Sequence, residues 1–252
     1  MQADWLVPDW RAEGVGAVMT TRAGGMSRAP FDSMNIRDAV GDDEAAVWHN
    51  RAVLASAIGV APVYLNQVHG AAVVRLDRRD AAADAPIHTA DASISTEPGI
   101  ACTAQVADCL PVLFAAPAGR GVGAAHAGWR GLALGVLEAT VQHLCATAQC
   151  EPGELQAWLG ACIGPTHFEV GEDVLEAFGA DPRASDRALF VPGKPGKWFA
   201  NLPQLARQRL NAAGVQNVTG GEWCTVGDAS RFYSFRRDGI TGRMVAAVWR
   251  QA

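Results

Sequence analysis

Two histidines and one cysteine lie in three short segments that each follow a strand-like run of the sequence. Imidazole nitrogen and thiolate sulfur are ligands that zinc prefers, and a catalytic zinc site combines three protein ligands with an open fourth position. A coordinating thiol is also deprotonated. We therefore predict a zinc site made by His69, Cys109 and His126. The segments are residues 66–70 (Asn-Gln-Val-His-Gly), 107–111 (Ala-Asp-Cys-Leu-Pro) and 125–131 (Ala-His-Ala-Gly-Trp-Arg-Gly).

Packing is the competing explanation for each of these residues, because a single His or Cys beside an apolar strand is usually part of the core. The long spacings between the three residues match no local zinc motif. Two features favour a site. Glycine-containing turns follow both histidines, and Asp108 lies within an otherwise apolar run, where an unpaired carboxylate would be costly. Asp108 is therefore a candidate proton carrier.

Two glycine-rich segments are candidate sites for an anion. The segment 128–131 (Gly-Trp-Arg-Gly) opens a predicted helix, so backbone N–H groups and Arg130 could meet a phosphate there. The segment 20–25 (Thr-Thr-Arg-Ala-Gly-Gly) is a second such loop, and it carries Arg22. An ordinary strand-to-helix turn and a surface loop explain the two segments equally well. Neither matches a Walker A loop or a G-x-G-x-x-G fingerprint.

Other reactive motifs are absent from the sequence. Residues 167–169 (His-Phe-Glu) form an H-x-E, but the P-C-x-x-C of the nucleobase deaminases is missing. There is no H-E-x-x-H and no G-x-S-x-G. None of the six cysteines forms a C-x-x-C pair, which argues against a zinc finger or a redox dithiol. Cys145 and Cys150, at a predicted helix end, are interpreted as packing residues.

The elements that would position these segments alternate between strands and helices. Their order lacks the βαβ rhythm of a Rossmann fold and favours an α+β class. In the second predicted helix, Leu134, Leu137, Val141 and Leu144 share one apolar face. The predicted strands are residues 15–21, 63–67, 72–76, 99–105, 110–114, 122–125, 155–159, 232–235 and 244–249. The predicted helices are residues 42–58, 132–146, 171–178 and 203–213.

Composition narrows the class of protein. With 252 residues, 49% hydrophobic and 19% charged, the chain is typical of a globular enzyme, and we predict one domain over residues 1–252 because residues 152–153 and 182–196 are short as linkers. A net charge of -5 argues against a nucleic-acid partner. No apolar run is long enough for a membrane span, and the first residues lack the positive region of a signal peptide. We therefore expect a cytoplasmic protein without a membrane partner; its oligomeric state is open.

At these segments the sequence resembles the YfiH family, also called laccase-domain or polyphenol-oxidase-like proteins. The resemblance extends over almost the whole chain and departs from the pattern where the family's Asn-Leu-Gly is replaced by Asn-Ile-Arg at residues 35–37. Its motifs are residues 20–27, 67–70, 107–113, 124–131, 163–165, 168–171 and 233–237.

The resemblance implies a layered sandwich of two mixed β-sheets with helices packed outside. It also implies that zinc is held by the same three ligands, with copper as the alternative metal. The activities it implies are phosphorolysis of adenosine, inosine and methylthioadenosine, with a small-molecule nucleoside and phosphate as partners, and deamination of adenosine. At the matching positions, the candidate substrate- or phosphate-binding residues are Arg22, Asn35, Gln67, Arg130 and Arg236.

Three other functions remain as alternatives for a chain with these three reactive residues. A peptidoglycan-precursor editing hydrolase would use Cys109 as nucleophile with His69 or His126 as base. A copper-dependent polyphenol oxidase would need a histidine-rich copper cluster, whereas the chain has six histidines and no H-x-H. A binding module without catalysis would leave the three reactive side chains unexplained.

Overall fold

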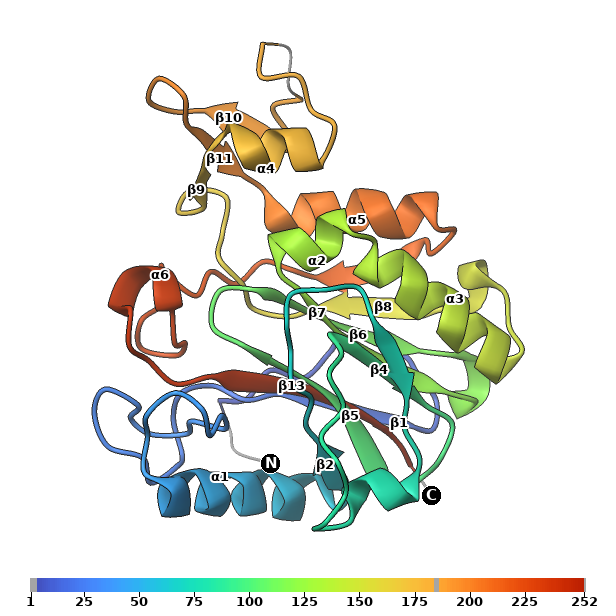
Figure 1. Ribbon diagram of the computed structural model, residues 1–252. Coiled ribbons are helices and arrows are strands. Elements are labelled where there is room, and N and C mark those ends of the chain that lie inside the picture. The colour runs from blue at the N-terminus through green and yellow to red at the C-terminus, as the bar shows by residue number, and fades with distance from the viewer. Residues whose placement is uncertain (1–3, 184–185, 252) are drawn as a thin grey trace.

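The computed structural model describes residues 4–183 and 186–251, and within these residues the strands form three sheets (Figure 1). The four-stranded sheet has the order β1-β13-β5-β2, and the six-stranded sheet has the order β12-β8-β6-β7-β4-β3. Each contains parallel and antiparallel neighbours. The α+β class with two mixed sheets is therefore confirmed, and a three-stranded sheet, β10-β11-β9, is added to it.

The strands are short, as expected for a mixed sandwich. They are β1 Val15–Met19, β2 Ala61–Val63, β3 Val73–Arg75, β4 Ala92–Ser95, β5 Ile100–Val106, β6 Leu110–Ala115, β7 Val122–Ala127, β8 Gln156–Leu159, β9 Glu169–Val170, β10 Phe190–Pro192, β11 Trp198–Ala200, β12 Asn217–Gly220 and β13 Met244–Arg250. The α-helices are α1 Glu44–Ile58, α2 Trp129–Ala133, α3 Val136–Ala148, α4 Glu172–Ala177, α5 Leu202–Ala212 and α6 Phe235–Asp238. Single turns of 3₁₀ helix are η1 Arg78–Ala81, η2 Pro117–Gly119 and η3 Pro152–Glu154.

The two large sheets stack face to face, and helices cover their outer faces (Figure 1). Apolar side chains between the sheets, including Met19, Leu113 and Trp158, are fully buried. A second apolar cluster lies between the six-stranded sheet and the helices α3 and α5, and a third lies under α1. Burial of each large apolar side chain stabilises the fold by about 1.5–3 kcal/mol. The two sheets therefore form a rigid scaffold for the loops at their strand ends.

Helix α1 confirms the helix predicted over residues 42–58, with its ends set by local chemistry. The Asp43 carboxylate accepts hydrogen bonds from the backbone N–H groups of Ala45 and Ala46, at 2.8 and 3.2 Å. Gly59 adopts φ 72° at the C-terminus, and its N–H bonds the carbonyl of Ala55. These caps satisfy backbone groups that a helix end leaves without partners.

The helix predicted over residues 132–146 is wrong in one respect, because the structure has two helices there. α2 ends at Ala133 and α3 begins at Val136, directly after Gly135, which adopts φ 91°. Leu134, predicted on the buried face with Leu137, is 67% exposed, whereas Leu137 is fully buried. Glycine tolerates the left-handed backbone that this break requires, and the change of direction turns Leu134 towards solvent.

The strand predicted over residues 232–235 is also wrong. Phe232 and Tyr233 are buried between the sheets in irregular backbone, and Phe235 begins the short helix α6. The Ser234 hydroxyl accepts a hydrogen bond from the N–H of Arg237, at 3.2 Å. This helix cap competes with strand pairing at a serine, which explains why the aromatic run does not continue as a strand.

One of the two segments considered as linkers in the sequence belongs to a sheet. Of residues 182–196, the described part leads into β10 and the β10–β11 turn, so it belongs to the small sheet. Residues 1–3, on which the argument about a signal peptide partly rests, lie outside the described residues. Among the helices of the described residues, none is both long and apolar enough to cross a membrane.

Candidate metal centre

The three predicted ligands come from different loops and strands and meet at one end of the sandwich. His69 lies in the loop after β2, Cys109 in the turn between β5 and β6, and His126 near the end of β7. Because β6 and β7 pair antiparallel with Pro111 opposite His126, the Cys109 turn lies beside that histidine. The candidate ligand atoms of the three residues all lie within 4.8 Å of one another.

Contacts within the trio are close. Cys109 Sγ lies 3.7 Å from His69 Nε2. The two imidazole rings have centroids 4.8 Å apart and meet edge to face at 74°. His126 is 3% exposed, whereas His69 is an exposed residue with φ 61°, so the cluster is buried on one side and open on the other. An open side is what a small-molecule substrate needs.

Asp91, which the sequence analysis did not select, connects two of the three ligands. Its carboxylate Oδ1 lies 2.8 Å from His126 Nδ1 and accepts the N–H of His69 at 2.9 Å. Its Oδ2 accepts the N–H groups of Val68 and Gly70. A carboxylate on Nδ1 fixes the ring orientation and directs Nε2 of His126 to a metal.

The charges of the cluster support each other. Burial alone would raise the pKa of the Cys109 thiol, but the charge of His126 and hydrogen bonds with both histidines lower it to about 6. Burial alone would lower the pKa of His126, but the Cys109 thiolate and the Asp91 carboxylate raise it to about 9. Burial would also raise the pKa of Asp91, yet its hydrogen bonds with His126 and Gly70 hold it below the ordinary value. The side chains thus favour a thiolate.

Two glycines allow the ligands to come this close. A Cβ atom at Gly128 would lie 2.9 Å from Cys109 Sγ and 3.0 Å from His69 Cδ2. A Cβ atom at Gly131 would lie 2.7 Å from the carbonyl oxygen of Gly70. All three distances are shorter than ordinary van der Waals contact, so the start of α2 packs on the centre only because these positions lack side chains.

The donor set fits a transition metal. Two imidazoles and one thiolate form a ligand set that zinc and copper both accept, and three protein ligands suit a site with an open position. The oriented Nε2 of His126 and the lowered pKa of Cys109 match the states in which these side chains bind a metal. Within the described residues, no other group of three such side chains is gathered.

Asp108 lies next to Cys109 in the chain, and its carboxylate is already engaged. Thr225 Oγ1 donates to Oδ1 at 2.6 Å, and the N–H of Arg236 donates to Oδ2 at 2.6 Å. Asp108 adopts φ 93° and its carbonyl accepts the N–H of Ile163. These contacts give Asp108 a part in holding the Cys109 turn in place; its role as a proton carrier stays a prediction.

Three of the predicted substrate-binding residues make contacts that order the loops. Arg22 donates to the carbonyls of Asp32 and Ala229. Asn35 is fully buried, and its amide hydrogen-bonds with four neighbouring groups. Gln67 pairs with the backbone of Gln105 at 2.8 and 2.9 Å, which ties the His69 loop to the end of β5. The contacts seen for these residues are structural.

The other two predicted arginines are exposed. Arg130 stacks over Trp129, with 4.4 Å from its guanidinium carbon to the ring centroid. Arg236 donates to the carbonyl of Glu169 at 3.0 Å and lies over Phe168. Among the described residues, the Arg130 guanidinium has no recorded hydrogen bond or ion pair, so it is free to meet an anion.

A second cysteine–histidine contact lies near the centre. Cys224 Sγ is 3.4 Å from His167 Nδ1 and accepts the N–H groups of Gly164 and Gly227, at 3.2 and 3.3 Å. His167 is exposed, and within the described part of the chain no carboxylate contacts its ring. This pair has no third ligand and no carboxylate behind the histidine.

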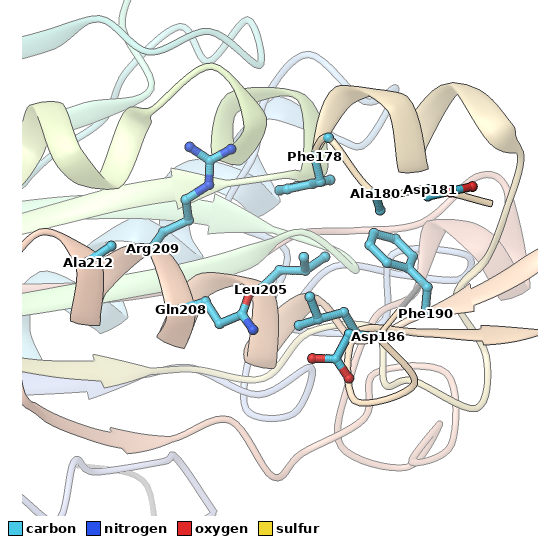
Figure 2. A pocket seen from close by; sticks show the side chains of 11 residues that line it. Phe178, Ala180, Asp181, Asp186, Phe190, Leu205, Gln208, Arg209 and Ala212 are labelled. Atoms are coloured by element: carbon cyan, nitrogen blue, oxygen red, sulfur yellow. The ribbon is translucent and has the colours of Figure 1, made fainter. Parts of the chain in front are cut away.

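A cavity of about 440 Å³ lies elsewhere, between the end of α4 and α5. Figure 2 shows Phe178, Phe190 and Leu205 around it, with Arg209 and Asp186 also at its lining. None of the three candidate ligands lines this cavity, which is therefore separate from the metal centre.

Together, the fold and the cluster define an α+β sandwich protein with a His₂Cys cluster at one end of the sandwich. The family model described as "Multi-copper polyphenol oxidoreductase laccase" matches residues 16–251. The chain is 50% identical over 250 residues to purine nucleoside phosphorylase PA4543 of Pseudomonas aeruginosa, covering 98% of both chains. It is 44% identical over 247 residues to purine nucleoside phosphorylase YfiH of Escherichia coli K12, covering 97% of this chain and 98% of the relative.

A solved structure agrees with the whole fold. The Neisseria meningitidis protein NMB0706 superposes with a TM-score of 0.90 at 42% identity, covering 99% of this chain and 100% of that one. The chain therefore belongs to the YfiH family, as the sequence motifs predicted.

Proposed function

We propose that this chain is a zinc-dependent purine nucleoside phosphorylase. The observation that carries the proposal is the His69–Cys109–His126 cluster in a chain 50% identical, over 98% of its length, to a purine nucleoside phosphorylase. The reaction joins a phosphate oxygen to C1′ of the ribose and breaks the bond from C1′ to the purine. The electron pair of that bond leaves with the base, which takes up a proton, and ribose 1-phosphate is the second product.

The chain's own residues would contribute orientation and charge. Asp91 holds the Nδ1 side of His126, so that Nε2 faces the cluster. Cys109 is held as a thiolate, since its pKa lies at about 6. The exposed side at His69 admits the nucleoside. A bound zinc ion would supply Lewis acidity to this site. We further propose adenosine, inosine and methylthioadenosine as substrates, and adenosine deamination as a second activity.

The test uses purified protein whose zinc content is measured by elemental mass spectrometry. Incubation with adenosine and phosphate should release adenine and ribose 1-phosphate, and incubation without phosphate should release inosine. A His126→Ala variant is the matched negative control, because it removes one ligand. A zinc-loaded protein that forms neither ribose 1-phosphate nor inosine contradicts the proposal.

A hydrolase acting on a peptidoglycan precursor is the second candidate, because one observation favours it. The Cys109 thiolate beside His126 resembles the activated pair of a thiol hydrolase. The two functions respond in opposite ways to chelation. A thiol hydrolase keeps its activity when the metal is removed, whereas the zinc-dependent phosphorylase loses it.

Copper-dependent oxidation of phenols, which the name of the family model suggests, finds less support. The six histidines of the chain include only two in the cluster, and within the described residues no second group of metal ligands is gathered beside it. A single His₂Cys copper site transfers one electron and does not by itself reduce oxygen. Metal analysis combined with a phenol-oxidation assay tests this function directly.

A further inference from the structure

Two arginines that the sequence analysis did not select for binding lie beside the metal centre. In the antiparallel pair of β5 and β13, Met244 is opposite Val106. Arg243 directly precedes β13, and the Asp108–Cys109 turn follows β5 after one residue. The register therefore brings Arg243 to the end of the sheet where Cys109 lies.

A buried amide holds Arg37 next to Arg243. Asn35 Oδ1 accepts the backbone N–H of Arg37 at 3.1 Å and the backbone N–H of Arg243 at 2.9 Å. The N–H of Ile36 also donates to the carbonyl of Arg243, at 3.2 Å. Asn35 is fully buried, so this clamp is shielded from solvent and fixes two arginine backbones side by side.

The two guanidinium groups are poorly compensated. Arg243 donates through one nitrogen to the carbonyls of Thr241 and Gly242 and lies 5.8 Å from the centroid of the Phe235 ring. Within the part of the chain that the structure describes, neither guanidinium forms an ion pair with a carboxylate, and none of the hydrogen bonds involves the Arg37 side chain. Two guanidinium groups that lack a carboxylate partner, on adjacent backbone segments, favour an anion with several oxygens.

The electrostatics of Arg243 agree with its position in the strand register. Burial and the neighbouring charge of Arg37 lower the pKa of Arg243, while Cys109 and Asp108 act in the opposite direction. Arg243 therefore experiences the charge of a second arginine and the opposite charge of the Asp108–Cys109 turn, which the β5–β13 register brings to the same end of the sheet. Repulsion between neighbouring like charges is costly for the fold, and a bound anion would relieve this cost.

We propose that Arg37 and Arg243 form the subsite for the phosphate ion beside the His₂Cys centre. This inference rests on the proposed phosphorolysis, because it assigns residues to the second substrate of that reaction. The family pattern carries glycine at the position of Arg37, so the pair strengthens phosphate binding in this chain without being required for bond cleavage. Its signature is an effect on the KM for phosphate that leaves kcat nearly unchanged.

The test compares three single variants in which arginine is replaced by glutamine. Arg37→Gln and Arg243→Gln each remove one guanidinium. Arg79→Gln is the matched control, since Arg79 is an exposed arginine near the opposite end of β5, paired with Asp77. In phosphorolysis assays, the KM for phosphate should rise about tenfold or more in each site variant, as expected for loss of a charge-assisted hydrogen bond. The KM for the nucleoside and the kcat at saturating phosphate should change less than about twofold, and Arg79→Gln should match the wild type.

A direct measurement separates this inference from the proposed activity. Isothermal titration with inorganic phosphate should detect binding to the wild type and to Arg79→Gln, with affinity reduced about tenfold in Arg37→Gln. If the wild type binds phosphate through these residues but cleaves no nucleoside, the subsite is supported and the proposed function fails. If the KM for phosphate and the binding are unchanged in Arg37→Gln, the subsite is wrong whatever the activity. A titration with a purine nucleoside 5′-monophosphate identifies the source of the phosphate: binding that is tighter than for inorganic phosphate and lost in Arg37→Gln overturns the assignment to the free ion.

Discussion

Cys109 and Cys224 each neighbour, in the sequence, one partner of the hydrogen bond that the Thr225 hydroxyl donates to Asp108. The surroundings of the two cysteines nevertheless differ. Cys109 contacts two histidines, one of which is fixed by the buried Asp91. Cys224 contacts the exposed His167 and two backbone N–H groups. The comparison teaches that a thiol beside an imidazole becomes a candidate metal site when a carboxylate holds the ring and a third ligand lies nearby.

Replacing the Asp91 carboxylate should have the largest effect on the difference between the Cys109 and Cys224 surroundings. Asp91→Asn removes the negative charge that accepts from Val68, His69, Gly70 and His126, so the zinc affinity should fall about 10- to 100-fold. A competition titration with a chromogenic chelator measures it. Asp80→Asn is the control, because Asp80 contacts His88 at 2.7 Å outside the centre. An Asp91→Asn protein that binds zinc as tightly as the wild type would contradict the role given to Asp91.

Added methyl groups should distinguish the two cysteines next. Gly128→Ala brings a Cβ to 2.9 Å from Cys109 Sγ, and overpacking of about 1–3 kcal/mol should lower zinc affinity roughly tenfold or more. Gly227→Ala is matched to it, since its Cβ would lie 3.6 Å from Cys224 Sγ, an ordinary contact, and should leave the zinc content unchanged. Metal analysis after dialysis, with circular dichroism to check folding, measures both. Equal zinc contents in the two folded variants would refute the steric argument.

Thiol reactivity should differ between the zinc-loaded and metal-free protein. With a pKa of about 6, Cys109 in the chelated protein is mostly thiolate at pH 7, and its alkylation by iodoacetamide should slow about tenfold between pH 7 and pH 5. The sign follows from the lowered pKa, because the thiolate persists above about 6 and is protonated below it. Peptide mapping by mass spectrometry locates the modified residue, and zinc should protect Cys109. A midpoint near the ordinary thiol value would disprove the thiolate assignment.

The smallest effect on zinc content and phosphorolysis is expected from changes to the Cys224–His167 pair. Cys224→Ser keeps an acceptor for the N–H groups of Gly164 and Gly227, so zinc content and phosphorolysis should stay within about twofold of the wild type. Cys109→Ser is the contrasting variant, since it removes the thiolate from the cluster. A loss of zinc in Cys224→Ser comparable to that in Cys109→Ser would mean that the two pairs act as one site.

The meeting of the three candidate metal ligands could be predicted from the sequence because each lies in a short motif at a strand end, where backbone turns bring side chains together. Asp91 could not be selected by the same means, although a carboxylate between Ala90 and Ala92 was a usable signal. Its partner is set by the register of β4 and β7, in which Ala92 is opposite Ala125. That pairing is long-range and leaves no local pattern.

The substrate-binding candidates show the same limit. Arg22 and Asn35 belong to recognisable motifs, yet their side chains are used to order the N-terminal loop. Arg243 was missed because its position depends on the pairing of the C-terminal strand β13 with β5, which lies more than 130 residues earlier in the chain. The break at Gly135 was missed because periodicity in the apolar residues continues across it, while the backbone does not.

A single side chain anchors both the His126 ring and the backbone of residues 68–70, and this has a dynamic consequence. Any fluctuation that detaches the Asp91 carboxylate releases the N–H groups of Val68 and Gly70 together with the imidazole. Those amides should then exchange with deuterium as one cooperative unit, at a rate that reports how often the centre opens. The loop and the His126 imidazole would be released in the same event, so the exchange rate of the loop amides reports the release of this candidate metal ligand.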